Sequence, residues 1–252
     1  MKIVIIGGSG LIGTKVANIL RSRGHDVNQA SPSTGVNALT GEGLADVLAG
    51  ADVVLDVANS PSFEPAAVLS FFETATANLL EAEAKAGVGH HVALSIVGLE
   101  RSPDNGYFPG KLAQEARVKN GGVPYTIVRS TQFLEFIGGI ADSMAVDGTV
   151  HASPGAFQPI SADDVAAFVA DAVCADPING TLEIAGPEKG PMSDFLKRFL
   201  EAKGDDRKIV VDRASKYFGS LVDEESLVPL GPAKLGKVDF ATWFAKSTVR
   251  AA

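Results

Sequence analysis

Cysteine, clustered positive charge and long apolar runs are all scarce in this sequence. Cys174 is the single cysteine, so the chain cannot form an internal disulfide, and a reducing compartment such as the cytoplasm is expected. Its helical spacing from Val165, Val169 and Ala172 favours a buried small hydrophobe over a reactive thiol.

The charge and hydropathy patterns exclude two classes of partner. The formal net charge is −8 and no basic run exceeds two residues, which argues against a nucleic-acid-binding surface. No apolar stretch approaches the roughly 18–20 residues that cross a bilayer. The opening "MKIVIIGGSG" has too few apolar positions before its glycines for a signal peptide. We therefore expect neither a membrane association nor a leader, and a small molecule as the partner.

The four histidines do not form a metal-binding pattern. His90 and His91 are adjacent, so on a strand they face opposite ways and cannot share one ion. His25 and His151 have no carboxylate or cysteine at a ligand spacing. No metal site is expected.

Strand and helix signals alternate along the chain, which predicts a doubly wound α/β fold with a parallel sheet. The strongest helix spans about 64–86, with Pro65 in its first turn and Gly87 after its end. A further helix begins after Ser161, where Asp164 completes a capping pattern. The expected strands are 2–7, 26–31, a weak one at 35–39, 52–58, 90–98, 124–133 and 181–187.

No linker or internal repeat divides the sequence, so we expect one domain over 1–252. Segments 134–155 and 187–252 contain helical pieces and glycine- and proline-containing stretches. We interpret them as a small lid over the carboxyl ends of the strands. The oligomeric state stays open, with a homodimer as one arrangement.

The stretch "GGSGLIG" follows the first strand and opens a helix. Its glycines, Gly7, Gly10 and Gly13, allow a tight turn and a close backbone approach to a pyrophosphate at the helix N-terminus. A structural turn without ligand is the alternative. The full set of expected dinucleotide contacts from this loop and the strand end at 57–58 is Gly7, Ser9, Gly10, Leu11, Ile12, Gly13, Val57 and Ala58.

The end of the second strand favours NADP over NAD. An NAD site usually offers a carboxylate about 20 residues past the glycines, and none is present here. Ser31, Ser33 and Thr34 could instead donate to a 2′-phosphate, and Lys15 could add charge. The loop has no arginine, so NAD stays open, as does an ordinary polar loop.

These motifs, together with "TANLLEAEAKAGVGHHVALSIVG", Tyr107 with Lys111, and "QPISADDVA", resemble the short-chain dehydrogenase/reductase superfamily, and most closely its atypical, NmrA-like branch. The resemblance covers about residues 1–187. It implies a reducing site made of Ser95, Tyr107 and Lys111. It also implies that Thr131, Gln132 and Phe133 contact the nicotinamide and that Asn78 has a structural role.

The implied roles fit the chemistry of the side chains. Ser95 would hold the substrate oxygen, Tyr107 would donate its proton, and the Lys111 ammonium would lower the tyrosine pKa and bond the nicotinamide ribose. Pro109 and Gly110 disfavour a helix interior. We therefore expect the helix to begin at about Phe108, which would leave Tyr107 at its cap and pointing elsewhere.

Three functions remain open. The first is an NAD(P)H-dependent reductase, with NADP favoured, acting on a small carbonyl-type or related electrophile. The second is a dinucleotide-sensing regulator without turnover. The third, a sugar-nucleotide epimerase or dehydratase, is disfavoured because only about 65 residues follow Gly186.

Overall fold

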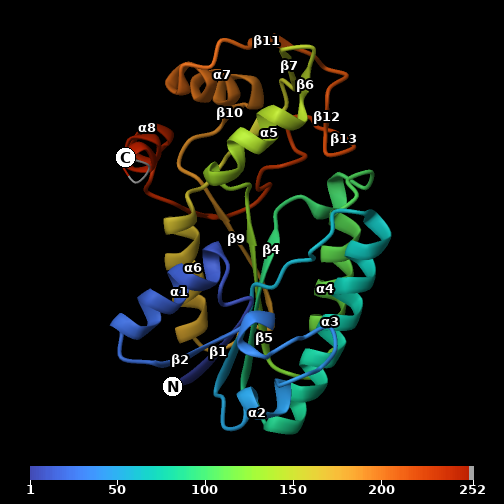
Figure 1. The fold of residues 1–252 in the computed structure, drawn as a ribbon, viewed down its shortest axis with the longest axis vertical. Helices are drawn as coiled ribbons and strands as arrows, with labels where there is room; N and C mark the ends of the chain where they lie inside the picture. Colours follow the sequence, from blue (N-terminus) through green and yellow to red (C-terminus); the bar gives the residue numbers. More distant parts are fainter. Residues whose placement is uncertain (250–252) are drawn as a thin grey trace. The chain divides into compact units, whose positions relative to one another are not determined.

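The computed structural model describes residues 1–249, and over this range seven strands form the main, mostly parallel sheet (Figure 1). Their order is β14-β9-β5-β4-β3-β1-β2. The strands are β1 Lys2–Ile6, β2 Asp26–Ala30, β3 Val53–Asp56, β4 His90–Ile96, β5 Tyr125–Ser130, β9 Gly180–Ala185 and β14 Lys234–Leu235. The predicted α/β fold class is confirmed.

The helices have lengths and ends that follow from their sequences. Pro65 opens α3, and Gly87, at φ 72°, ends it in the left-handed conformation, as predicted. Ser161 Oγ accepts from the Asp164 N–H at 3.1 Å and so caps α6. The helices are α1 Leu11–Ser22, α2 Leu44–Leu48, α3 Pro65–Ala86, α4 Phe108–Asn120, α5 Ile137–Ser143, α6 Ala162–Cys174, α7 Met192–Lys203 and α8 Phe240–Val249. No helix of the described chain is both long and apolar enough to span a membrane.

The predicted strand at 35–39 is wrong. This segment instead forms a turn in which Asn37 and Glu42 make an isolated bridge. The Asn78 side chain on α3 donates to the carbonyls of Ala38 and Leu39, both at 3.0 Å. These bonds satisfy the backbone without a neighbouring strand, and they give Asn78 the expected structural role.

The chain divides into two compact units, which are described separately. The first comprises residues 1–95, 107–129 and 165–182. In it, α3 and α4 run side by side over one face of the strands, and α1 and α6 cover the other face (Figure 1). One core cluster joins Val4 and Val54 of the sheet to Leu48 and Leu79 of the helices. Burial on both faces explains the continuous apolar runs of β1 and β3.

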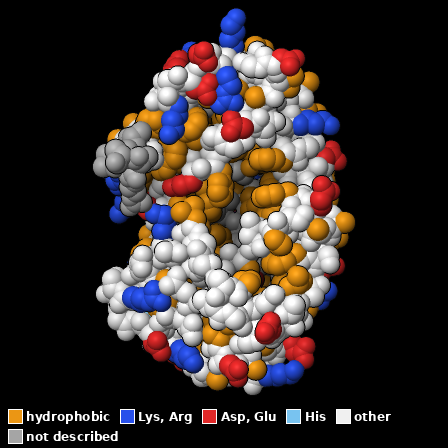
Figure 2. All heavy atoms as spheres, viewed as in Figure 1, with side chains coloured by type: hydrophobic (Ala, Val, Ile, Leu, Met, Phe, Trp, Pro, Cys, Tyr) orange, Lys and Arg blue, Asp and Glu red, His pale blue; other side chains and the backbone are white. Residues whose placement is uncertain are grey.

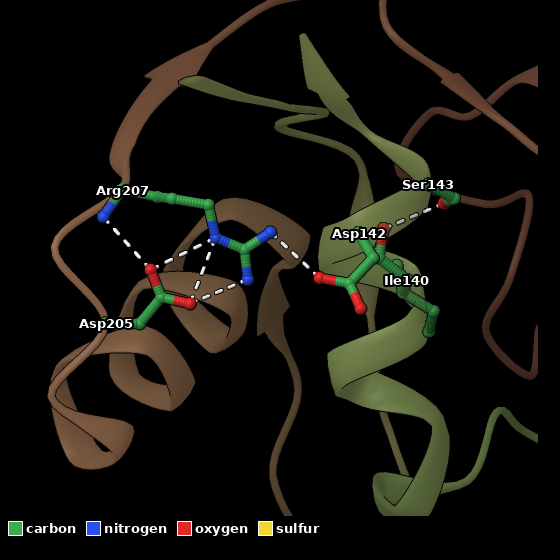
Figure 3. A network of polar contacts seen from close by, with 5 residues as sticks. All are labelled: Ile140, Asp142, Ser143, Asp205 and Arg207. Carbon is green, nitrogen blue, oxygen red and sulfur yellow. Dashed lines mark hydrogen bonds and ion pairs between the residues drawn. The ribbon is translucent and has the colours of Figure 1, made fainter. Parts of the chain in front are cut away.

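The second unit comprises residues 96–106, 130–164 and those from 183 onward. Arg207 donates to Asp205 at 2.7 Å and to Asp142 of α5 at 2.8 Å, which ties α5 to the loop after α7 (Figure 3). Its short strands are β6 Ala145–Val146, β7 Thr149–Ala152, β8 Ala156–Phe157, β10 Gly190–Pro191, β11 Lys208–Val211, β12 Lys216–Tyr217 and β13 Ser220–Leu221. On the face drawn in Figure 2, Lys and Arg side chains are scattered among acidic ones rather than gathered in a patch.

Candidate functional site

The glycine loop lies where the sheet changes direction. The chain runs from β1 out to β2 and returns to β3 on the other side of β1. In α/β sheets, the carboxyl ends of the strands at such a point are the usual place for a ligand. Gly7 follows β1 at φ 81°, and a Cβ there would lie 2.6 Å from the Val57 carbonyl oxygen. A Cβ on Gly13 would lie 2.5 Å from the Gly7 oxygen. Only glycine allows this approach of the two strand ends and α1.

The N-terminus of α1 is open to a ligand. Gly10 is its N-cap, with no side-chain cap bond and no acidic residue in the first turn. Ser9, Gly10 and Leu11 are exposed, whereas Ile12 and Gly13 are buried. The first backbone N–H groups of a helix have no partner within the helix, and they favour an anion. The cradle therefore fits a dinucleotide pyrophosphate.

The loop after β2 is organised by its own hydroxyls. Ser31 and Ser33 share a hydrogen bond of 2.8 Å, and Thr34 Oγ1 accepts from the Ser31 N–H at 2.9 Å. Thr34 also donates back to the Ser31 carbonyl, which closes a short 3-10 turn over Pro32–Thr34. Ser33 and Thr34 are exposed. The loop contains no carboxylate that would repel a 2′-phosphate.

A cation that the sequence analysis did not identify lies beside this strand. Arg21, in the last turn of α1, donates to the Gln29 side chain at 2.7 Å and to the Val27 carbonyl at 3.0 Å. Gln29 in turn donates to the Gly8 carbonyl at 2.6 Å. The glycine loop is thus held from β2 as well as from β3.

The three predicted catalytic residues lie in the same unit as the glycine loop, and each has a defined partner. Ser95 is buried and donates to Glu115 Oε1 at 2.6 Å. Tyr107 is the N-cap residue of α4, as expected from Pro109, and its hydroxyl donates to Asn59 Oδ1 at 2.7 Å. Their roles in catalysis stay predictions.

Lys111 is buried one turn after the tyrosine. Its ammonium donates to the Leu94 carbonyl at 2.8 Å and to Gln114 Oε1. The ammonium nitrogen also lies 4.7 Å from the centre of the Phe72 ring. The Phe72 and Tyr107 rings make an edge-to-face contact, with 5.6 Å between their centres. An ammonium has three donors, so one N–H has no hydrogen-bond partner among the described residues.

The electrostatics of the pair differ from the expectation. Burial, reinforced by the negative charge of Asp56, raises the pKa of Tyr107 above its usual value. Burial lowers the pKa of Lys111 to about 8, although Asp56 and Glu115 oppose that shift. The expected lowering of the tyrosine pKa by Lys111 is wrong for this arrangement, because desolvation of the phenol dominates. Tyr107 therefore keeps its proton at neutral pH.

Four polar residues around the pair were not identified from the sequence: Asp56, Asn59, Gln114 and Glu115. The Glu115 carboxylate accepts from Arg129 through two bonds of 2.7 Å and from Lys119 at 3.0 Å. Burial alone would raise the pKa of Glu115, but the bonds from Arg129 and Ser95 lower it overall. The sequence did contain one indication of Gln114 and Glu115: they follow Lys111 by three and four residues, which places all three side chains on one face of a helix.

The other predicted cofactor contacts lie in the second unit. Thr131 is buried and donates to the Gln158 carbonyl at 2.7 Å. Phe133 stacks on Phe136, with 5.4 Å between ring centres. Gln132 is 7% exposed, and both polar atoms of its side chain are buried without a protein partner. Contacts from these residues to a nicotinamide stay predictions.

The expectation that Cys174 is buried is wrong, whereas the histidine spacing is as expected. Cys174 is exposed rather than buried, because it occupies the outer side of the last turn of α6. Its sulfur lies 3.4 Å from His25 Nε2, and His151 Nδ1 lies 3.6 Å from an Asp212 oxygen. Both histidines thus have partners that are distant in sequence. Within residues 1–249, no three metal-ligating side chains form a group.

Residues 7–176 match the family described as NAD(P)H-binding. The chain is 31% identical, over 280 aligned positions, to a protein from Cucumis sativus named divinyl chlorophyllide a 8-vinyl-reductase, chloroplastic. That match covers 91% of this chain and 66% of the relative, so the chain spans less than two thirds of the cucumber protein. A protein of the same name from Zea mays is 29% identical, and the match covers 91% of this chain and 69% of the maize protein.

Solved structures show the same fold at lower identity. A dTDP-4-dehydrorhamnose reductase from Clostridium acetobutylicum is 18% identical with a TM-score of 0.73, and both chains are covered over 100% of their length. MoeE5 in complex with UDP-glucose and NAD is 16% identical with a TM-score of 0.75, also over 100% of both chains. This chain therefore belongs to the family described as NAD(P)H-binding, and it shares its fold with these structures.

Proposed function

We propose that the protein is an NADPH-dependent reductase in which Tyr107 donates the proton. The observation that carries the proposal is the position of Tyr107 and Lys111. Both lie in the unit that holds the glycine cradle, and both are bonded to residues at the ends of the neighbouring strands: Asn59 after β3 and Leu94 in β4. The bound cofactor would supply hydride to the electrophilic carbon of the substrate.

A tyrosine with a raised pKa suits this role. A phenol that stays protonated at neutral pH always has a proton to give, and the alkoxide or carbanion formed by hydride addition is a much stronger base than phenolate. Proton transfer to that atom is therefore favourable without prior activation of Tyr107. The unpartnered N–H of Lys111 is available to a ribose hydroxyl.

Two substrate chemistries follow from the comparisons and from the superfamily. The reductases of cucumber and maize are named for a vinyl group, whose C=C bond accepts hydride when it is conjugated with an electron-withdrawing system. A carbonyl compound is the other class. We propose the conjugated alkene first, because it rests on the greater sequence identity.

The test compares wild type with Tyr107→Phe for NADPH consumption on aldehydes, ketones, quinones and vinyl-substituted conjugated substrates. The expected result is loss of turnover with cofactor binding unchanged, since phenylalanine keeps the edge contact with Phe72 and removes only the hydroxyl. Tyr125→Phe is the matched control and keeps activity. Full turnover by Tyr107→Phe would exclude the proposed role.

A dinucleotide-sensing protein is the second candidate. The hydrogen bond that the buried Ser95 hydroxyl donates to the Glu115 carboxylate at 2.6 Å supports it, because that bond occupies the hydroxyl proton. Tight NADPH binding with no turnover across the whole panel would favour this function over the reductase.

A further inference from the structure

The Tyr107–Lys111 pair is connected at both ends to one short segment at the end of β3, residues 56–59. The Tyr107 hydroxyl donates to Asn59, as described above. Three residues before Asn59, the Asp56 carboxylate accepts from the Ala58 N–H at 3.0 Å through Oδ1. The segment that positions the phenol is therefore itself held by Asp56.

The other oxygen of Asp56 leads to the lysine through a single side chain. Gln114 Nε2 donates to Asp56 Oδ2 at 2.8 Å, and Gln114 Oε1 accepts from the Lys111 ammonium. Asp56 and Lys111 are each 4% exposed and Gln114 is 1% exposed, so water does not replace these bonds. The exit of β3 and helix α4 thus form a closed hydrogen-bonded ring that contains both members of the pair.

A neutral amide is the side chain that fits between these two charges. Its N–H group matches the carboxylate and its C=O group matches the ammonium, so both buried charges are satisfied. A glutamate would add a second negative charge next to Asp56. An apolar side chain would leave an ammonium donor and a carboxylate oxygen buried without partners, which is costly.

We propose that Gln114 is a positioning residue that links the Lys111 ammonium to the Asp56 carboxylate and thereby keeps Lys111 charged and fixed, with one donor left for a ligand. The catalytic meaning of this link depends on the proposed reductase function. The hydrogen-bonded link from Lys111 through Gln114 to Asp56 does not depend on that function, and it can be tested without any substrate.

Other charges also face this lysine. Glu115 lies on the same helix, and the buried pair of Glu83 and His91 lies on α3 and β4, with a hydrogen bond of 2.8 Å between them. Asp56 and Glu115 raise the pKa of Lys111 against the larger effect of burial. His91 is the nearby group whose protonated form acts against the lysine charge. The contribution of Gln114 must therefore be separated from these groups.

The experiment follows the Lys111 side chain by NMR titration of the full chain with isotope-labelled lysine, assigned with Lys111→Arg. Gln114→Met keeps the volume and removes both polar ends, and should lower the pKa of Lys111 by about one unit or more. Gln114→Glu should raise it. Shifts of opposite sign cannot come from a general loss of stability.

Gln158→Met is the matched control, because Gln158 also makes a buried bond, to the Gly186 carbonyl at 2.9 Å, in the other unit. It should leave the Lys111 titration unchanged. If Gln114→Met does not fold, Gln114→Asn, whose amide is too short to bridge, replaces it. An unchanged Lys111 pKa in a folded Gln114 variant would overturn the proposal.

Turnover gives an independent second measurement. With an active substrate, the loss of kcat/KM for NADPH on raising the pH should begin at lower pH in Gln114→Met than in wild type. If no substrate is found, the reductase proposal fails, whereas the NMR titration still decides the role of Gln114.

Discussion

At the residue scale, the cofactor cradle depends on the absence of two side chains. Gly7 and Gly13 each lie where a Cβ would overlap a backbone oxygen, at 2.6 Å and 2.5 Å. Gly10 is different, because its nearest neighbour would be 3.3 Å away. Two of the glycines thus serve packing between β1, β3 and α1, and we expect the third to serve the approach of the ligand.

We expect Gly13→Ala and Gly10→Ala to fail in different ways. Gly13→Ala must open the loop and should lower the free energy of unfolding by about 1–3 kcal/mol. Gly10→Ala should leave stability nearly unchanged and weaken NADPH binding. Denaturant unfolding and cofactor titration of both variants measure the difference. Equal losses of stability would contradict the separate roles.

At the element scale, the buried carboxylate of Glu115 ties α4 to two strands of the sheet. Glu115 on α4 bonds Ser95 in β4 and Arg129 in β5, so it ties the helix that carries Lys111 to both strands. Breaking such a pair by removing one partner leaves the other charge buried and unpaired.

Glu115→Gln should therefore cost about 3–5 kcal/mol of stability at neutral pH. The pKa of Glu115 is lowered in the folded state. Its contribution to the free energy of unfolding is therefore fully present above the usual glutamate pKa near 4.5, and it is lost as the pH falls through the lower folded-state pKa. The stability difference between wild type and variant should shrink below about pH 4. Urea unfolding at several pH values measures it, with the exposed Glu81→Gln as a control that changes little. A difference independent of pH would contradict the assignment.

The sequence predicted the elements that depend on local pattern. The ends of α3 and the cap of α6 follow from Pro65, Gly87 and Ser161, and the structure confirms them. The prediction of a strand at 35–39 was wrong because the Ala38 and Leu39 carbonyls accept hydrogen bonds from Asn78, which is 40 and 39 residues away.

Partners in the site are equally non-local. Tyr107 and Lys111 were found by spacing, but Asn59 and Asp56 are 48 and 58 residues from the side chains that bond them. The direction of the Tyr107 pKa shift also depends on burial, which a spacing of four residues does not reveal.

At the scale of the whole molecule, the chain contributes separate stretches to each compact unit. The glycine cradle, the hydroxyl loop after β2 and the Tyr107–Lys111 pair all belong to the first unit. A ligand that binds only the folded state stabilises it in proportion to the logarithm of its concentration.

NADPH at about 100 times its dissociation constant should add about 2.7 kcal/mol to the stability, and a thermal-shift assay should show a rise of several degrees. NADH at the same concentration should give a smaller rise, because the loop of Ser31, Ser33 and Thr34 lacks a carboxylate. Ser33→Asp should reverse this order by repelling the 2′-phosphate. A larger shift with NADH in the wild type would contradict the preference for NADPH.

The first unit is assembled from three stretches, the last of which ends at residue 182. On the ribosome, its central strands are synthesised long before the segment that carries most of α6. The sheet face that α6 covers therefore stays exposed until late in translation. Completion of this unit therefore depends on contacts between residues far apart in the chain, which slows folding and leaves apolar strands exposed during translation. Amino-terminal fragments that stop before α6 should accordingly aggregate and depend on chaperones to stay in solution.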